Sequence, residues 1–501
     1  MSYLGLDIGT TGCKAVIFDE QGKQLACAYR EYAVISEHRD WAELDPEQVW
    51  RKCTDVIKEA VSLCRNDPVR GIGISSQGEA FTPIGDSGEI LGNAMVSSDS
   101  RAADLVREWS DEFGRERLYR ITGHTPHPIF TLFKLLWLKE NRPDVWLRTR
   151  KFYCFEEFVQ HKLGLDPAIS WPLAGRTMMF DIRRHEWSAD ILDYAGIDRQ
   201  RLARTLPSGT VVGTISPSAA RELGIPDNVI VVTGGHDQPC GALGAGITRR
   251  GRAVYSIGTV ECITPAFEDP ILSDELFRNN LASYDYTVPG MYTTVAYSLT
   301  GGNILKWYRD EWGQVEALEA IGNRTNVYEY LISKVHPTPT DLLVLPYFTP
   351  SGTPYFDVDV KGAILGLRLS TGRAEVLRAL LEGVAFEMRL NLELLKQSGI
   401  HIEELVAIGG GAKSSTWLQL KADVLDKPIC RAVVTEAGCM GVAMLACSAE
   451  TGEDIEAIAQ EWVQVADVVE PDVENARYYD EQFEKYVKIY PALRALCCKQ
   501  R

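Results

Sequence analysis

The chain has 501 residues, 45% of them hydrophobic, and a formal net charge of -17. Chains of this length form two or three hydrophobic cores, and a strongly acidic balance excludes nucleic acid and an anionic membrane as expected partners. The 12 cysteines are scattered without a CxxC pair, which is typical of a reduced, cytoplasmic protein.

The first segment, LGLDIGTTGCK, reads as a strand, a turn and a second strand. The first strand is expected over Tyr3 to Ile8, the turn over Gly9 to Gly12, and the second strand over Ala15 to Phe18, which is β-branched and aromatic. A Walker phosphate loop is excluded, because Lys14 lies two residues after Gly12 and no Ser or Thr follows it in the required place.

Further elements of the first half follow from caps and apolar runs. Asp45 followed by a proline predicts a helix to about Cys64. Buried strands are expected over 69–75 and 229–233, and a helix over 131–140. The stretch VRGIGISSQG does not predict a dinucleotide site, because its glycine spacing is wrong and its first two glycines lie within the strand.

The strand, Gly-Thr turn and strand pattern recurs over 252–263, where Gly258 and Thr259 form the turn. Two copies, each at the head of about half of the chain, predict an internal duplication in which each half supplies one phosphate loop. Asp7 lies two residues before the first turn, whereas Ser256 takes that place in the second. A polar, glycine-containing link at 248–252 predicts domains over 1–247 and 253–501.

The second half continues with alternating elements. We expect a helix opened by Gly301-Gly302-Asn303, a strand over 341–348, a long helix over 372–395, a strand over 405–408, and a helix over 414–425 after Gly409-Gly410-Gly411. The tail over 474–496 is predicted to be an amphipathic helix that Pro491 interrupts.

Several of these pieces could carry chemistry. Backbone amides of the Gly-Thr turns and the threonine hydroxyls could hold the phosphates of a nucleotide. Asp7 ends an apolar strand, where a carboxylate is costly unless it is paired or hydrated, and Mg²⁺ would relieve that cost. A structural role for Asp7 is the alternative. The glycine run 409–411 is either a packing turn or a flat shelf for adenosine.

Asp237 follows a buried strand and begins a predicted helix. It could be a helix N-cap, or a general base at the carboxyl edge of a sheet, where ligands of α/β proteins bind, or both. His124 and His127 have a spacing that a metal pair could use. No cysteine or acidic cluster nearby completes a metal shell, so they are expected to be ordinary loop histidines.

Two longer patterns identify a family. TLFKLLWLKEN over 131–141, and GAILGL over 362–367 followed after seven residues by EVLRALLE over 375–382, stand beside the DIGTT opening. With these motifs the whole chain resembles the FGGY carbohydrate kinases, the group of glycerol kinase and xylulokinase. The resemblance implies an α/β fold of two ribonuclease-H-like domains, of the actin and hexokinase type, that flank a cleft.

The resemblance also implies the cofactors and their contacts. ATP and Mg²⁺ are expected, and whether the chain forms a homodimer is left open. Asp237 matches the catalytic base of the family, and Asp7 its metal-associated carboxylate. The predicted ATP contacts are Thr10, Thr11, Lys14, Gly258, Thr259, Gly302, Gly411 and Ser415.

The sugar-binding residues differ from both reference enzymes of the family. Gln77, Gly78, Glu79, Asp99 and Gln238 are the predicted substrate contacts, and Arg101 is a weaker candidate beside Asp99. Glycerol kinase has an arginine where this chain has Gly78 and a tyrosine where it has Ile129, and xylulokinase has Met-His near Gln77.

We therefore expect ATP-dependent phosphorylation of a hydroxyl of a small sugar or polyol, most of all a ketose such as xylulose or a related pentose. The alternatives are a polyol kinase with an erythritol- or glycerol-like substrate, and an actin-like ATPase without a small-molecule acceptor. A sensor that binds sugar without turnover is disfavoured, because Asp7 and Asp237 are both present.

Overall fold

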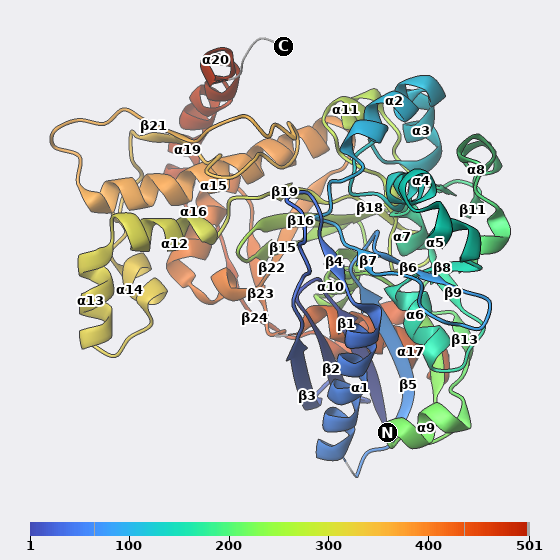
Figure 1. Ribbon diagram of the computed structural model, residues 1–501. Helices are drawn as coiled ribbons and strands as arrows, with labels where there is room; N and C mark the ends of the chain where they lie inside the picture. Colours follow the sequence, from blue (N-terminus) through green and yellow to red (C-terminus); the bar gives the residue numbers. More distant parts are fainter. Residues whose placement is uncertain (65, 435, 498–501) are drawn as a thin grey trace.

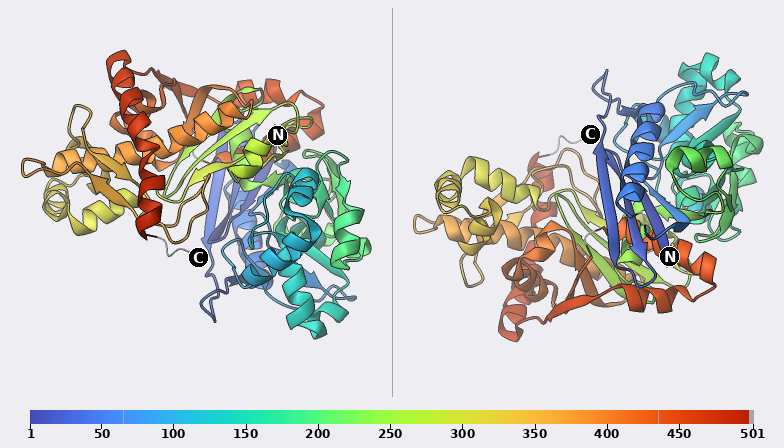
Figure 2. Two further views of the ribbon diagram at one scale, coloured as in Figure 1. Left: turned by 90° about the horizontal axis from the view of Figure 1, so that it is seen from above. Right: turned by 90° about the horizontal axis from the view of Figure 1, so that it is seen from below.

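Two β-sheets organise the chain, one in each half (Figure 1). The computed structural model describes residues 1–64, 66–434 and 436–497, so the end of the predicted second domain, 498–501, lies outside the described part. Figure 2 shows the blue and green first half beside the yellow and orange second half from above and from below. No helix in the described ranges has the length and apolar character that a membrane span requires.

The first half contains the following elements: β1 (Ser2–Ile8), β2 (Gly12–Asp19), β3 (Gln24–Glu31), β4 (Glu43–Leu44), α1 (Pro46–Leu63), β5 (Val69–Ser76), β6 (Phe81–Ile84), β7 (Ala94–Met95), α2 (Ala103–Phe113), α3 (Arg115–Thr122), α4 (Thr131–Asn141), α5 (Pro143–Arg148), β8 (Lys151–Cys154), α6 (Phe155–Lys162), β9 (Ala168–Ser170), α7 (Trp171–Gly175), β10 (Phe180–Asp181), β11 (Glu186–Trp187), α8 (Ala189–Ala195), the 3-10 helix η1 (Arg199–Arg201), β12 (Arg204–Leu206), β13 (Val211–Thr214), α9 (Pro217–Leu223), β14 (Ile230–His236) and α10 (Asp237–Gly244).

The second half contains these elements: β15 (Gly251–Ile257), β16 (Glu261–Phe267), α11 (Asp274–Arg278), β17 (Tyr284–Asp285), β18 (Tyr292–Thr293), β19 (Ala296–Ser298), α12 (Asn303–Glu311), α13 (Gln314–Gly322), α14 (Val327–Ser333), β20 (Leu343–Leu345), β21 (Ala363–Leu365), α15 (Arg373–Gln397), β22 (Ile402–Ile408), the 3-10 helix η2 (Gly410–Lys413), α16 (Ser415–Leu425), β23 (Ile429–Ala432), α17 (Ala437–Thr451), α18 (Ile455–Trp462), β24 (Val465–Val469), α19 (Val473–Tyr486) and α20 (Ile489–Cys497).

The first sheet has the strand order β13-β14-β5-β1-β2-β3. β1 and β2 form the antiparallel hairpin that the opening segment predicts, and β1, β5 and β14 run parallel. Ser76 pairs with both Ile8 and His236, so these three strands end at the same level. The residues that follow them therefore leave the sheet at one edge, where parallel α/β sheets bind their ligands.

The second sheet repeats this arrangement. β15 and β16 form an antiparallel hairpin around the second Gly-Thr turn, and β15 pairs in parallel with β22. Ser256 pairs with Ile408, so the second turn and the glycine run at 409–411 emerge beside each other. The structure thus agrees with the internal duplication that the two turns predict.

Helix α17 belongs to the second half by sequence but packs on the first sheet, against β1 and β5 and beside α10 (Figure 1). Glycines in the strands permit this close approach, because a Cβ at Gly5 would lie 1.9 Å from the carbonyl oxygen of Cys439, and one at Gly73 would lie 2.1 Å from that of Val442. The glycines of β5 thus serve helix packing.

Most predicted elements occur with ends shifted by a few residues, and three details differ. β14 continues through both glycines to His236, and Asp237 is the first residue of α10 instead of its N-cap. Within the strand predicted over 341–348, the structure has only the shorter strand β20. The tail divides at 487–488 into α19 and α20, and Pro491 lies in the first turn of α20, where a proline needs no hydrogen-bonded N–H.

Candidate active site

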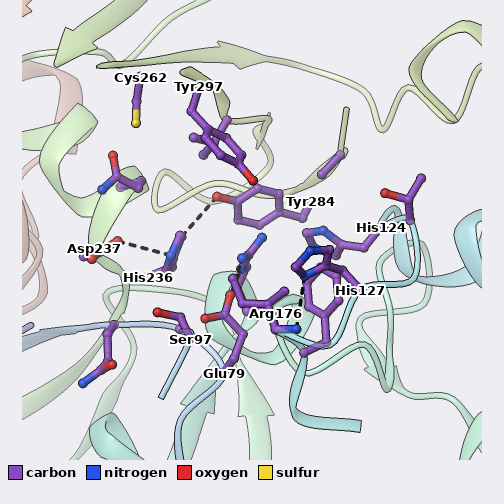
Figure 3. A pocket seen from close by; sticks show the side chains of 18 of the residues that line it. Glu79, Ser97, His124, His127, Arg176, His236, Asp237, Cys262, Tyr284 and Tyr297 are labelled. Carbon is purple, nitrogen blue, oxygen red and sulfur yellow. Dashed lines mark hydrogen bonds and ion pairs between the residues drawn. The ribbon is translucent and has the colours of Figure 1, made fainter. Parts of the chain in front are cut away.

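A cavity of about 250 Å³, lined by polar and apolar side chains, lies at the carboxyl edge of the first sheet (Figure 3). Both halves of the chain contribute to it: the lining residues are Thr10, Gln77, Gly78, Glu79, Ser97, His124, Thr125, His127, Ile129, Phe130, Arg176, His236, Asp237 and Gln238 from the first half, and Cys262, Asn280, Ala282, Tyr284, Val295, Tyr297 and Phe356 from the second. Five of the predicted substrate and catalytic residues, namely Gln77, Gly78, Glu79, Asp237 and Gln238, therefore come together in one place.

Asp237 lies at the start of α10 with its side chain 34% exposed toward the cavity. Loss of surrounding water is the main cause that raises the pKa of this carboxyl to about 7, and the nearby charges of Asp7 and Glu79 act in the same direction. A carboxylate with a pKa near neutrality is suited to take up a proton from a hydroxyl group.

His236 and Tyr284 form a chain of contacts behind Asp237. The Nε2 atom of His236 lies 3.2 Å from Oδ1 of Asp237, and its Nδ1 atom lies 3.2 Å from the Tyr284 hydroxyl. Burial and the charge of Arg176 hold the pKa of His236 well below its usual range, so the imidazole is neutral. A neutral ring that donates from Nε2 to Oδ1 of Asp237 accepts the Tyr284 proton at Nδ1, so His236 does not occupy Oδ2.

Glu79 forms a buried ion pair with Arg176, the residue that follows α7. Both Nε and Nη2 of Arg176 contact Oε1 of Glu79, and the guanidinium lies 5.0 Å from the centre of the Phe130 ring. Glu79 has a positive φ of 64°, a conformation that a residue other than glycine adopts at a cost and that is common at functional sites. The Thr131 hydroxyl donates to the Glu79 carbonyl at 2.9 Å, which supports this backbone.

The first Gly-Thr turn lies beside Gln77. The Thr10 hydroxyl donates to Oε1 of Gln77 at 3.1 Å, and Nε2 of Gln77 donates to the Gly9 carbonyl at 3.1 Å. The Tyr32 hydroxyl lies 2.6 Å from the Gly9 carbonyl, and the Tyr32 N–H donates to the Thr11 carbonyl at 3.1 Å. The turn is therefore held firmly, with Thr11 exposed above the sheet.

Asp7 lies directly below this turn, and Oδ1 accepts the Ser75 hydroxyl at 2.6 Å. Loss of water raises its pKa, against the opposing effects of Ser75 and Lys14. Among the described residues no three His, Cys, Asp or Glu side chains form a group that could hold a metal alone. A buried carboxylate beside the Gly-Thr turn would fit Mg²⁺, an ion that proteins hold by one or two carboxylates together with substrate phosphates and water.

Lys14 is placed beside the same carboxylate, opposite Asp7 in the hairpin register. Its ammonium group is ion-paired with Glu436, which precedes α17, and lies 5.5 Å from the centre of the Tyr29 ring. The pair connects the first sheet to a segment of the second half. Its contact with ATP stays a prediction.

The predicted ATP residues of the second half form a cluster of their own at the end of β15 and β22. The Gly302 N–H donates to the Gly258 carbonyl at 2.8 Å, and the Asn303 N–H donates to the Thr259 carbonyl at 3.2 Å. A Cβ at Gly411 would lie 2.3 Å from Cγ2 of Ile257. Ser415 begins α16, and its hydroxyl accepts from Nη2 of Arg431 at 2.9 Å.

Asp99 lies in a buried network outside the cavity lining. It accepts the Ala42 N–H at 2.8 Å and Nη2 of Arg101 at 2.6 Å, and the Arg101 guanidinium lies 3.8 Å from the centre of the Trp41 ring. This ion pair lies in the segment that directly follows Ser97, a residue that does line the cavity. Substrate binding by Asp99 and Arg101 stays a prediction.

Sequence reasoning missed several cavity residues, namely His124, His127, Arg176, His236, Tyr284 and Tyr297. The spacing of His124 and His127 was the only signal, and it pointed to a metal pair or to ordinary loop histidines. Both histidines lie in the loop before α4, as one of these expectations has it, and both also line the cavity. Arg176 and Tyr284 carry no motif of their own, because only the fold brings α7 and β17 to this edge.

Family comparison agrees with this geometry. The model of the N-terminal domain of the FGGY family of carbohydrate kinases matches residues 2–244, and the model of the C-terminal domain matches 253–450. The chain belongs to the FGGY family of carbohydrate kinases. The two ribonuclease-H-like domains that the motifs predict are thereby confirmed, as is the reaction class, ATP-dependent transfer of a phosphoryl group to a hydroxyl of a small sugar or polyol.

Individual members of the FGGY family are similar to this chain over nearly its whole length. A xylulose kinase of Bacillus subtilis is 28% identical over 497 residues, which cover 98% of this chain and 97% of that protein. A gluconokinase of Bacillus licheniformis is 24% identical, with 98% and 96% covered. The solved structure of a xylulose kinase from Rhodospirillum rubrum superposes with a TM-score of 0.90 at 26% identity and covers 99% of each chain.

Proposed function

We propose that this kinase transfers the γ-phosphoryl group of ATP to a terminal hydroxyl of an uncharged ketose, xylulose or a related pentose, with Asp237 as general base. The observation that carries the proposal is the Asp237 carboxyl, whose pKa is raised to about 7, in a cavity lined by both halves of the chain. The similarity to xylulose kinases over almost the full length supports a ketopentose. A four- or three-carbon polyol is the alternative.

In this mechanism Oδ2 of Asp237 accepts the proton of the substrate hydroxyl while its oxygen bonds to the γ-phosphorus, and the bond from that phosphorus to the bridging oxygen breaks to release ADP. His236 holds Oδ1 and so fixes the direction of the free oxygen. Positioning and electrostatics supply most of the rate of such transfers. Cavity residues from both halves would exclude water, so that ATP hydrolysis does not compete.

The triphosphate would lie between the two Gly-Thr turns. Thr10, Thr11 and Lys14 would contact it from the first half, and the cluster of Gly258, Thr259, Gly302, Gly411 and Ser415 from the second. Asp7 would hold Mg²⁺, which when bound neutralises charge on the phosphate oxygens. We also propose the division into domains at 247 and 253 and a cytoplasmic location, as expected from the sequence, which leaves a homodimer open.

A screen of ADP release with Mg-ATP over ketopentoses, pentitols, erythritol, glycerol and gluconate tests the proposal. We expect ketopentoses, xylulose first, to give the highest kcat/KM. A rate that no sugar or polyol changes would contradict the proposed function, and a rate that a protein partner stimulates would favour the actin-like ATPase instead.

A further inference from the structure

The end of the cavity away from Asp237 contains polar side chains that the proposed phosphoryl transfer does not use (Figure 3). In this view Asp237 lies at one side and His124 and His127 lie at the other, with Arg176 and Glu79 between them. Resting on the proposed sugar kinase function, we propose that Arg176, together with Glu79 and the two histidines, forms a hydroxyl-binding subsite that selects uncharged chains of more than three carbons.

Gly78 makes room for Arg176. A Cβ at position 78 would lie 3.4 Å from both Cβ and Cγ of Arg176, and 3.1 Å from Cδ2 of His236. The contact with His236 is tight enough to require a small shift, and the contacts with Arg176 are ordinary van der Waals contacts, so a Cβ at position 78 would lie directly against the stem of Arg176 and a longer side chain would compete with it for space. The absence of an arginine at 78 therefore does not remove a guanidinium from the sugar site, because Arg176 supplies one from the end of α7.

The ion pair of Arg176 and Glu79 leaves hydrogen-bonding capacity on both partners. Within the described part of the chain, the hydrogen bonds of the guanidinium all go to Oε1 of Glu79. A guanidinium has five N–H groups, and a carboxylate has two acceptor oxygens. Nη1 of Arg176 and Oε2 of Glu79 therefore remain as a donor and an acceptor for hydroxyl groups of a ligand.

The two histidines add further polar atoms. Nε2 of His124 is buried and has no hydrogen-bond partner among the described residues, and the whole residue is 1% exposed. Nδ1 of His127 accepts the Ile129 N–H at 3.2 Å, so the proton of the neutral ring is on Nε2. A buried polar atom without a partner is costly unless a ligand or water supplies the missing hydrogen bond. Both rings line the cavity, where a ligand can reach them.

The charges of the subsite balance, which determines the class of ligand. Arg176 is paired with Glu79, and burial together with the charge of Arg176 lowers the pKa values of His124 and His127, so both are neutral. A carboxylate of an aldonate would have to compete with Glu79 for the guanidinium and would lie close to that negative charge. Hydroxyl groups meet neither obstacle, because each donates and accepts without a net charge.

The subsite also defines a minimum length of the substrate. One terminal hydroxyl must reach Asp237, and the hydroxyls at the other end must reach the two histidines beyond Arg176. We therefore expect a ketopentose to bind at both ends, and glycerol to contact only one end. The predicted selectivity is ketopentose over glycerol, and ketopentose over gluconate.

The test compares the preferred ketopentose with the analogue that lacks the terminal hydroxyl opposite the phosphorylated end. The wild-type kinase is expected to prefer the complete sugar by about 10- to 100-fold in kcat/KM, because the analogue leaves the polar groups that would bind the missing hydroxyl without a hydrogen-bond partner. In the charge-balanced double variant Glu79→Gln/Arg176→Met, and in His124→Phe, this preference should fall to about threefold or less. Arg148→Met, at a 67% exposed arginine of α5, is the matched control.

A preference for the complete sugar that the variants leave unchanged would overturn the subsite while the proposed kinase function stands, and so would a wild-type preference for gluconate. If wild-type ADP release responds to no sugar, the proposed function fails. The subsite is then tested on its own by calorimetric titration of the ATP-free protein with xylulose, glycerol and gluconate. Binding of xylulose that is at least tenfold tighter than that of the other two supports it, and any other order overturns it. Unchanged ATP affinity verifies that each variant is folded.

Discussion

The pH dependence of the reaction follows from the surroundings of Asp237. A general base must be ionised, and with a pKa of about 7 only about 9% of Asp237 is ionised at pH 6, against about 90% at pH 8. An aspartate with the ordinary value of 3.8 would be about 99% ionised at pH 6. We therefore predict that kcat/KM falls about tenfold from pH 8 to pH 6.

Glu79→Gln tests the cause of this pKa. The pKa of Asp237 is raised by loss of water and by the charges of Asp7 and Glu79. It is lowered by the Gln238 N–H and by Arg176. His236 contacts the Asp237 carboxyl directly. The substitution removes one negative charge and frees the positive charge of Arg176, and both changes favour the ionised form. The midpoint should move to lower pH by on the order of one unit, in addition to any loss of sugar affinity.

The assay is the rate of sugar phosphate formation at a sugar concentration well below KM, measured by direct separation of the product so that coupling enzymes do not limit the pH range. At such concentrations the profile reports the free enzyme. A flat wild-type profile between pH 6 and pH 8, or a midpoint of Glu79→Gln that stays or moves to higher pH, would refute the reasoning.

Two further substitutions probe the positioning of the base and the packing of α17. Tyr284→Phe removes the hydroxyl 3.2 Å from Nδ1 of His236, so kcat should fall by about three- to tenfold with little change in the KM for ATP; an unchanged kcat would show that the contact does not matter. Gly5→Ala would place a Cβ 1.9 Å from the Cys439 carbonyl and should lower the free energy of unfolding by about 3 kcal/mol or more. Urea denaturation measures this loss, with Gly322→Ala as the control in open space; equal stability of the two variants would contradict the packing argument.

The frame of the candidate site could be predicted from the sequence because its signals are local. The first Gly-Thr turn, Asp7 and Asp237 each lie in a short motif at the end of an apolar strand, and parallel strands bring such ends to one edge; the second Gly-Thr turn lies at the corresponding edge of the second sheet. The sheet register, in which Ser76 pairs with both Ile8 and His236, realises this expectation.

The sugar end of the cavity could not be predicted in the same way, because it depends on contacts between residues far apart in the chain. Gly78 indicated only a missing side chain, and its meaning depends on Arg176, which reaches the same space from α7. Tyr284 comes from the other half of the chain. The placement of α17 on the first sheet likewise follows from tertiary packing at Gly5 and not from a local pattern.

Asp237→Asn provides the most direct test of the central claim that one carboxylate deprotonates the attacking hydroxyl. The variant keeps the size of the side chain and removes its basicity, so it should bind ATP with wild-type affinity and lose sugar phosphorylation by at least about 100-fold across pH 6 to 8. Phosphorylation within a few-fold of the wild-type rate would contradict the account.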